Sequence, residues 1–297
     1  MNIQKYFKAG LMITVLLSNY AVAEITASEK NSDEFVFDQW PGKSLKVFLA
    51  LPEEVRKDTP IVIVLHGNSR NAKTYRDAWE KTAIEENVIA VVPEFSAWDY
   101  PKRQYILGNM STPSGKPVAP DQWVFAAIEP LFDQLRKQLG TEVKHYSLYG
   151  HSAGSQVAHR LLYFVPDNRA QRIVLANAGF YTMPVSTVDY PQGLGGVEVS
   201  DDSLKKAYAK RVIILLGDRD NNPRHKSLNR ELESLRQGPH RFSRGHNFYK
   251  NSLFKASILL KVPFNWSLSI ASGVSHSNQN IIPFAAPLLL GGPLVVN

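Results

Sequence analysis

The sequence predicts an α/β fold with a mostly parallel central sheet and helices on both faces. Two observations lead to this prediction. Apolar runs of strand length alternate with longer segments that carry apolar residues at helical spacing. Several of these runs are unbroken, which is typical of parallel strands whose two faces are both covered by helices. Alternating units of this length build a parallel sheet with helices packed against it.

The order of the elements can be read along the chain. In sequence, we expect strands at 35–37, 45–50 and 61–65, a helix ending near residue 86, a strand at 88–92, a helix at 123–138, a strand at 146–149, a helix at 156–165, and strands at 172–176 and 212–216. Two long connections, 94–121 and 177–202, interrupt the alternation. Their aromatic side chains either roof a ligand pocket or pack the loops down.

The first residues have the pattern of an export signal. Lys5 and Lys8 precede the apolar run 9–17, and Ala21-Val22-Ala23 is a small-x-small cleavage site. We therefore expect a signal peptide at 1–23 with cleavage after Ala23, a loose polar segment at 24–34, and one α/β domain at 35–297. The expected location is the periplasm or the medium. The run is shorter than the roughly 20 apolar residues that span a bilayer, so stable membrane insertion is not expected.

Composition excludes several classes of function. The chain of 297 residues has a formal net charge of +7, but its Lys and Arg residues are scattered, so no nucleic-acid partner is expected. It contains no cysteine, hence no disulfide and no thiolate ligand. No His-Glu-x-x-His motif or comparable spacing of metal ligands occurs, and we expect neither a metal nor a cofactor.

The motif Gly150-His151-Ser152-Ala153-Gly154 lies between an expected strand and an expected helix. This context is typical of a nucleophile elbow, a strained turn that projects a serine hydroxyl towards a base. The glycines are needed because strand and helix pass close together there. The N–H of Ala153, at the start of the helix, is a candidate oxyanion donor. The motif predicts that Ser152 is a nucleophile.

A serine nucleophile of this kind is followed in the chain by an acid and then by a histidine. The loop after the strand at 212–216 offers Asp220, with Asp218 as the alternative. His276, in a late Gly/Ser-rich loop, has the position expected of the general base. We expect the triad Ser152, Asp220 and His276.

Further candidates line the expected site. The loop that follows the strand at 61–65 offers the N–H of Asn68 as second oxyanion donor, with Ser69 as the alternative. Arg241 and Arg244 either hold an anionic group or form structural ion pairs, and the second use is favoured. Side chains beside the oxyanion loop and the nucleophile, or on the long connections, are possible substrate contacts: His66, His151, Trp98, Tyr105 and Tyr181.

Several segments carry a family resemblance that covers roughly residues 36–277. They are 66–72 with Tyr75, 92–95, 150–156 with His159 and Arg160, 176–184, 216–220, 237–245 and 273–277. With these segments the chain resembles a bacterial family of poly(3-hydroxybutyrate) depolymerase-like proteins. The resemblance implies the α/β-hydrolase fold and the triad named above.

The uncharged segment 281–297 is broken by Pro and Gly. We expect it to pack against the sheet.

The expected function is hydrolysis of carboxylic esters through an acyl-enzyme. Small-molecule or oligomeric esters are the expected substrates, with short-to-medium aliphatic groups suggested by the aromatic loops. Two alternatives remain: a serine peptidase, because the same triad cleaves amides, or an exported binding protein that keeps the fold without turnover.

Overall fold

The computed structural model describes residues 32–101 and 104–291. The expected signal peptide and most of the expected loose segment therefore lie outside the described residues. Within the described ranges, eight strands form one sheet in the order β1-β2-β4-β3-β5-β6-β7-β8. Their bounds are β1 Ser32–Phe37, β2 Leu45–Ala50, β3 Ile61–Leu65, β4 Ile89–Glu94, β5 Tyr146–His151, β6 Ala170–Ala176, β7 Arg211–Gly217 and β8 Trp266–Ala271.

The sheet is mostly parallel, as the sequence predicts. β1 pairs antiparallel with β2, and β2 pairs antiparallel with β4. All pairings from β4 through β3, β5, β6 and β7 to β8 are parallel. The carboxyl ends of these parallel strands meet at one end of the sheet, which is where ligands bind in folds of this class.

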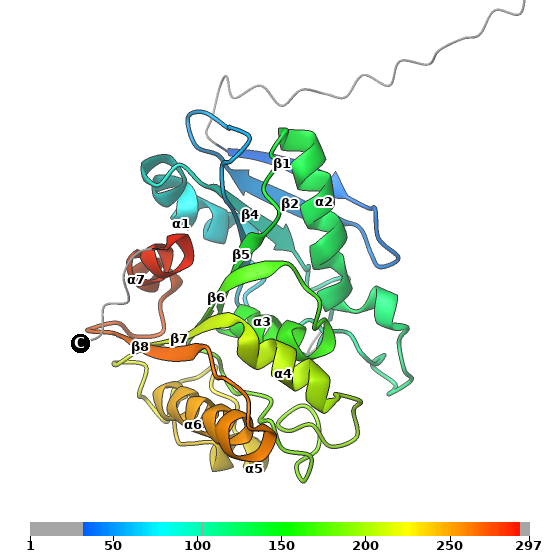
Figure 1. Cartoon of the computed structure of the whole chain (residues 1–297), viewed down its shortest axis with the longest axis vertical. Coiled ribbons are helices and arrows are strands. Elements are labelled where there is room, and N and C mark those ends of the chain that lie inside the picture. The colour runs from blue at the N-terminus through cyan, green and yellow to red at the C-terminus, as the bar shows by residue number, and fades with distance from the viewer. Residues whose placement is uncertain (1–31, 102–103, 292–297) are drawn as a thin grey trace, which may run out of the picture.

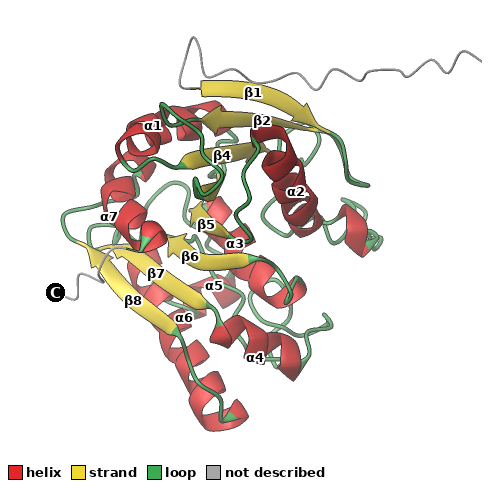
Figure 2. Ribbon diagram, turned by 45° about the horizontal axis from the view of Figure 1, so that its top comes forward, coloured by secondary structure: helices red, strands yellow, loops and turns green. Residues whose placement is uncertain are grey.

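Helices cover both faces of the sheet (Figures 1 and 2). Side chains of α1 and α7 join one apolar core, while those of α2, α3, α4 and α6 join the core on the other face. The α-helical bounds are α1 Ala72–Glu85, α2 Ile128–Leu139, α3 Ala153–Phe164, α4 Asp201–Ala209, α5 Leu232–Arg236, α6 Arg241–Phe254 and α7 Asn278–Leu290. Shorter elements are η1 Pro120–Gln122, η2 Val124–Ala127 and the π-helical η3 Lys255–Leu260.

The structure adds elements that the sequence pattern did not reveal. β8 is an edge strand whose four central residues are only partly buried, and its serines weaken the apolar signal. The segment from residue 281 packs on the sheet as expected, but it does so as the helix α7, with Pro283 and Pro287 inside it. The burial of its apolar side chains against β5, β6 and α1 offsets the hydrogen bonds that these prolines cannot donate.

The long connections pack down onto the domain. Tyr100 and Tyr105 in the first connection and Phe180 and Tyr181 in the second are buried, whereas Trp98 is 91% exposed. Of the two interpretations of these aromatic loops, packing against the domain therefore holds for most of the rings. In the described ranges, no helix is both long and apolar enough to cross a bilayer.

Candidate active site

Ser152 lies on a strained turn between β5 and α3. Its backbone has φ 57° and ψ −115°, a conformation that side chains other than glycine rarely adopt. Its N–H donates to the carbonyl of Ala176 on β6 at 2.9 Å. A Cβ on Gly154 would lie 1.9 Å from the carbonyl oxygen of Leu65, and a Cβ on Gly150 would lie 2.4 Å from that of Gly154. The close approach of strands and helix thus explains both glycines of the motif.

The structure brings Ser152, His276 and Asp220 into one chain of hydrogen bonds. The Nε2 atom of His276 lies 3.0 Å from the Oγ of Ser152, and its Nδ1 lies 2.7 Å from the Asp220 carboxylate. An ionised carboxylate only accepts hydrogen bonds, so Nδ1 carries the proton and Nε2 is left to accept from the serine. These atoms come from loops at the carboxyl ends of β5, β7 and β8.

Asp220 is buried and held by two partners. Besides His276, the Nη1 of Arg241 donates to its other carboxylate oxygen at 3.1 Å. Burial alone would raise the pKa of Asp220, but the hydrogen bond and charge of His276, together with Arg241, bring it below its usual value. Asp220 therefore remains ionised beside the imidazole.

Asp218, the alternative acid, has a different role in the structure. Its carboxylate accepts from the N–H of Gly273 at 2.8 Å and lies 3.5 Å from the hydroxyl of Ser272. These contacts tie the loop of His276 to the end of β7. The geometry favours Asp220 over Asp218 as the partner of His276.

The loop that follows β3 lies beside Ser152. A Cβ on Gly67 would be 3.8 Å from the Cβ of Ser152. The carbonyl of Gly67 accepts from the N–H of Arg70, which has φ 56°, and this tight turn leaves Asn68 and Ser69 exposed. Ala153 is buried at the first position of α3, where backbone N–H groups have no partner within the helix.

The buried side chain of His66 connects this loop to Phe95. Its Nε2 accepts from the N–H of Phe95 at 3.1 Å, so its Nδ1 carries the proton and donates to the carbonyl of Gly67 at 3.0 Å. Its ring stacks on Tyr105, whose hydroxyl donates to the carbonyl of His66. Burial lowers the pKa of His66 to about 4, which keeps it neutral.

A second buried histidine packs against His276. The Nδ1 of His151 lies 2.9 Å from the hydroxyl of Tyr75, and its ring centroid is 4.8 Å from that of His276. Burial, followed by the neighbouring charges of His276 and Arg241, lowers the pKa of His151 well below its usual value. The ring beside His276 is therefore an uncharged one.

The structure places the five side chains named as possible substrate contacts in two kinds of surroundings. His66, His151, Tyr105 and Tyr181 are buried, and none of them presents its side chain to solvent. His66 and Tyr105 contact the loop that follows β3, and Tyr181 stacks on Phe248. Trp98 is the exposed one of the five, and it lines a cavity of about 590 Å³.

Two residues that lie near the site were not among its expected members. Tyr75 and His225 reach the neighbourhood of His276 only through the fold, and the ring centroid of His225 is 5.5 Å from that of His276.

Arg241 forms the ion pair that was expected in preference to a ligand contact. Arg244 instead donates to three backbone carbonyls, those of Gly238, Gly179 and Asn229. Within the described residues, no cluster of His, Asp and Glu side chains is arranged to hold a metal ion.

No protein-family model matches the chain, and no curated protein matches it at significant similarity. Solved structures do match. A poly(aspartic acid) hydrolase from Sphingomonas sp. KT-1 is 40% identical with a TM-score of 0.85, over 88% of this chain and 99% of that one. A poly(3-hydroxybutyrate) depolymerase from Bordetella parapertussis is 30% identical with a TM-score of 0.84, over 93% of this chain and 94% of that one.

More distant matches share the fold alone. One is a fluorophosphonate-binding serine hydrolase from Staphylococcus aureus, with 16% identity and a TM-score of 0.58. The two closer matches cover nearly the whole domain at 30% identity or more. The chain therefore belongs to the poly(3-hydroxybutyrate) depolymerase-like family of the α/β-hydrolase superfamily, and it is a serine hydrolase.

Proposed function

We propose that the protein is an exported hydrolase that cleaves carboxylic esters through an acyl-enzyme, with Ser152 as nucleophile, His276 as general base and Asp220 as orienting acid. One observation carries the proposal. A continuous path of hydrogen bonds runs from the Oγ of Ser152 through both ring nitrogens of His276 to the buried carboxylate of Asp220.

The geometry supports the following steps. The Nε2 of His276 accepts the proton of Ser152 while Oγ attacks the ester carbonyl, and Asp220 stabilises the imidazolium that forms. His276 then donates this proton to the departing alkoxide. Water, deprotonated by the same nitrogen, attacks the acyl-enzyme. His276 then returns this proton to the Oγ of Ser152 as the acid leaves.

The backbone N–H groups of Asn68 and Ala153 are our proposed oxyanion donors. They come from the two segments that meet at Ser152, the loop after β3 and the start of α3. The positive end of the α3 dipole adds to the stabilisation of the oxyanion. The clamp of His66 on the carbonyl of Gly67 fixes the turn that presents Asn68.

A fluorophosphonate probe tests the nucleophile. We expect it to label the purified protein and to label neither Ser152→Ala nor the heat-unfolded chain. Labelling that persists in Ser152→Ala, or a folded wild-type protein that is never labelled, contradicts the proposal. Sequencing the amino terminus of protein recovered from the periplasm or medium tests export, and the expected first residue is Glu24.

Hydrolysis of amide bonds in an anionic polymer is the second candidate function. The relative at 40% identity is named a poly(aspartic acid) hydrolase. The loop that carries Asp220 also holds exposed Arg219, Arg224, Lys226 and Arg230, and among the described residues none of these cations has a carboxylate within ion-pair distance. We call these four cations the cationic rim. A polymer of carboxylates has the opposite charge and would be attracted to this rim.

Two substrate panels separate the candidates. Neutral p-nitrophenyl esters of graded chain length report esterase activity, and release of free amines from poly(aspartic acid) reports amidase activity. If the rim binds polyanions, the pair Arg224→Gln and Lys226→Gln raises KM for the polymer and leaves KM for the neutral esters unchanged. Lys81→Gln, a change at an exposed lysine of α1, is the matched control. Absence of amine release rules out the amide candidate.

A further inference from the structure

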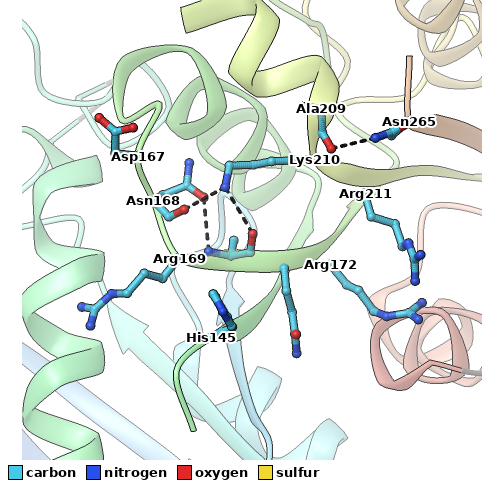
Figure 3. Close-up of a pocket in the computed structure, with 11 residues that line it drawn as sticks. His145, Asp167, Asn168, Arg169, Arg172, Ala209, Lys210, Arg211 and Asn265 are labelled. Atoms are coloured by element: carbon cyan, nitrogen blue, oxygen red, sulfur yellow. Dashed lines mark hydrogen bonds between the residues drawn. The ribbon is translucent and has the colours of Figure 1, made fainter. Parts of the chain in front are cut away.

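A cation-lined depression lies at the end of the sheet opposite Ser152. It has a volume of about 940 Å³ and sits at the amino ends of β5, β6 and β7 (Figure 3). Arg169, Arg172, Lys210 and Arg211 line it together with His145. We call it the amino-end pocket. It is formed by different residues from those around Ser152 and takes no part in the proposed reaction.

Three of its cations form no ion pair within the described residues. Arg169 is paired with Glu129 and Asp133, and Asp167 is paired with Lys206. In contrast, the described chain places no carboxylate within ion-pair distance of the three remaining cations. These are Arg172, Lys210 and Arg211.

These cations are held at the pocket by uncharged partners. Lys210 donates to the carbonyls of Asn168 and Ala170, and Arg172 donates to that of Leu288. Arg172 and Arg211 are register partners on neighbouring strands, and Figure 3 shows both extending to the same side of the pocket. Burial lowers the pKa of Lys210, and burial followed by the charge of Arg211 lowers that of Arg172. A bound anion would relieve both effects.

An exposed apolar cluster lies at the same end of the sheet. Phe254, Ile258 and Leu259 are 55%, 58% and 57% exposed, and Leu253 adjoins them. We call this cluster, at the end of α6 and in η3, the apolar tip. Six residues after Leu259, the same chain reaches the amino-end pocket at Asn265. Asn265 is fixed there by hydrogen bonds to the carbonyls of Tyr208 and Ala209.

The surroundings of the apolar tip are cationic. The segment 241–261 contains no Asp or Glu. Lys250 and Lys261 are exposed, and the described residues offer neither of them a carboxylate within ion-pair distance. Lys255 is paired with Asp201 of α4 at 3.3 Å. Exposed apolar side chains bordered by unpaired cations are characteristic of proteins that bind the interface of anionic membranes.

We propose that this end of the molecule docks on the surface of an anionic phospholipid bilayer. Phe254, Ile258 and Leu259 enter the interfacial layer, and the cations of the amino-end pocket take a phosphate head group. A second copy of the chain fits this face less well, because a symmetric contact would bring the same cations together, and the described residues give them no ion pair. The docked molecule keeps the carboxyl ends of its strands, and hence Ser152, directed towards solvent.

Vesicle co-sedimentation of the full chain tests the proposal. The expected result is binding to phosphatidylcholine vesicles that contain about 30% phosphatidylglycerol, and little binding to pure phosphatidylcholine. The triple variant Phe254→Ser/Ile258→Ser/Leu259→Ser should bind at least about tenfold more weakly. Lys250→Gln/Lys261→Gln should lose about fivefold for each lysine, as should Arg211→Gln.

Matched controls keep the test independent of folding and of the proposed reaction. Val36→Ser replaces a side chain that is 64% exposed on β1, at the other edge of the sheet, and should bind like the wild type. Fluorophosphonate labelling in solution should be equal in all variants. Equal binding to neutral vesicles, or unchanged binding by the triple variant, overturns the proposal. So does a concentration-dependent dimer that only the triple variant abolishes, since the tip would then be a contact between copies.

Discussion

Arg241 donates to the carboxylate of Asp220 at 3.1 Å, and the two side chains are 1% and 3% exposed. A buried pair of this kind is costly to break, because removing one partner leaves the other as an uncompensated charge in a poorly hydrated site. Arg241 begins α6, and Asp220 follows β7, so the pair also fixes α6 to the loop that carries the proposed acid. His225, at 3.5 Å from the Nη2 of Arg241, extends this contact towards His276.

The first prediction concerns this ion pair. Arg241→Gln should lower the free energy of unfolding by about 3 to 5 kcal/mol, because Asp220 loses its buried counter-charge. Denaturant unfolding at neutral pH measures this loss. Arg236→Gln removes an exposed ion pair with Glu233 and should change stability by less than about 1 kcal/mol. Equal losses of unfolding free energy in the two variants would show that the buried pair stabilises the fold no more than the exposed pair does.

The same pair has a consequence for the pH dependence of stability. The folded-state pKa of Asp220 is lowered, so its contribution to stability is present above its unfolded-state pKa of about 3.9 and is lost as pH falls through the folded-state value. Without Arg241, the folded-state pKa of Asp220 rises. Acid unfolding of Arg241→Gln should therefore begin at a higher pH than that of the wild type.

The second prediction separates the two candidate acids. Asp220→Asn should reduce kcat by about ten-thousand-fold, because an amide no longer enforces the tautomer of His276 that accepts from Ser152. Asp218→Asn should reduce kcat far less, since its carboxylate is hydrogen-bonded to the loop at Ser272 and Gly273 and not to His276. Steady-state kinetics with a p-nitrophenyl ester measure both effects. The reverse order of the two losses would assign the acid to Asp218.

The third prediction concerns Tyr75 and His151. Tyr75→Phe removes the hydroxyl that lies 2.9 Å from the Nδ1 of His151 and leaves a buried nitrogen without its partner. We expect a loss of about 1 to 3 kcal/mol in stability and a lower kcat with little change in KM, because His151 packs on the ring of His276.

Tyr146→Phe is the matched control for this variant. It removes one tyrosine hydrogen bond, to Glu129, at the amino end of the same strand that leads to Ser152. Its stability should fall, but its kcat should remain at the wild-type value. A kcat that is unchanged in Tyr75→Phe would limit the Tyr75–His151 pair to a purely structural role.

The fourth prediction concerns the buried His66, which contacts the carbonyl of Gly67 in the loop that follows β3. His66 has a folded-state pKa of about 4, below its unfolded-state value of about 6.5, so the unfolded chain binds the extra proton between these values. Stability therefore falls as pH is lowered from about 6.5 to about 4, by about 3 kcal/mol from this residue. His66→Gln should remove that part of the slope when unfolding is measured at several pH values. His151 and His159 add slopes of the same sign and remain in the variant.

Local sequence was sufficient to predict the elements with strong periodicity and the turn at Ser152. The unbroken apolar run of β3 and the Gly-x-Ser-x-Gly motif at Ser152 each depend on residues within a few positions of one another. The edge strand β8 and the helix α7 were not recognised. Their patterns are weakened by serines and prolines, and packing against distant segments stabilises them.

The order of the chain also indicated which residues to consider as acid and base. The order of the chain did not distinguish Asp218 from Asp220. That choice depends on the distance between two loops, because 56 residues separate Asp220 from His276. The burial of Tyr105 and Tyr181 could not be predicted from the sequence either. The local sequence around an aromatic loop residue does not differ between a side chain that faces a ligand and one that faces the core.

The sequence by itself determined the alternation of strands and helices and the strained turn at Ser152, since both follow from side-chain spacing and from glycine at positions of close backbone approach. Only the tertiary structure decided which carboxylate faces His276, that Arg241 neutralises it, and that Tyr75 reaches His151. These contacts join residues far apart in the chain, and their free energy comes from burial and charge pairing that exist only once the domain has packed.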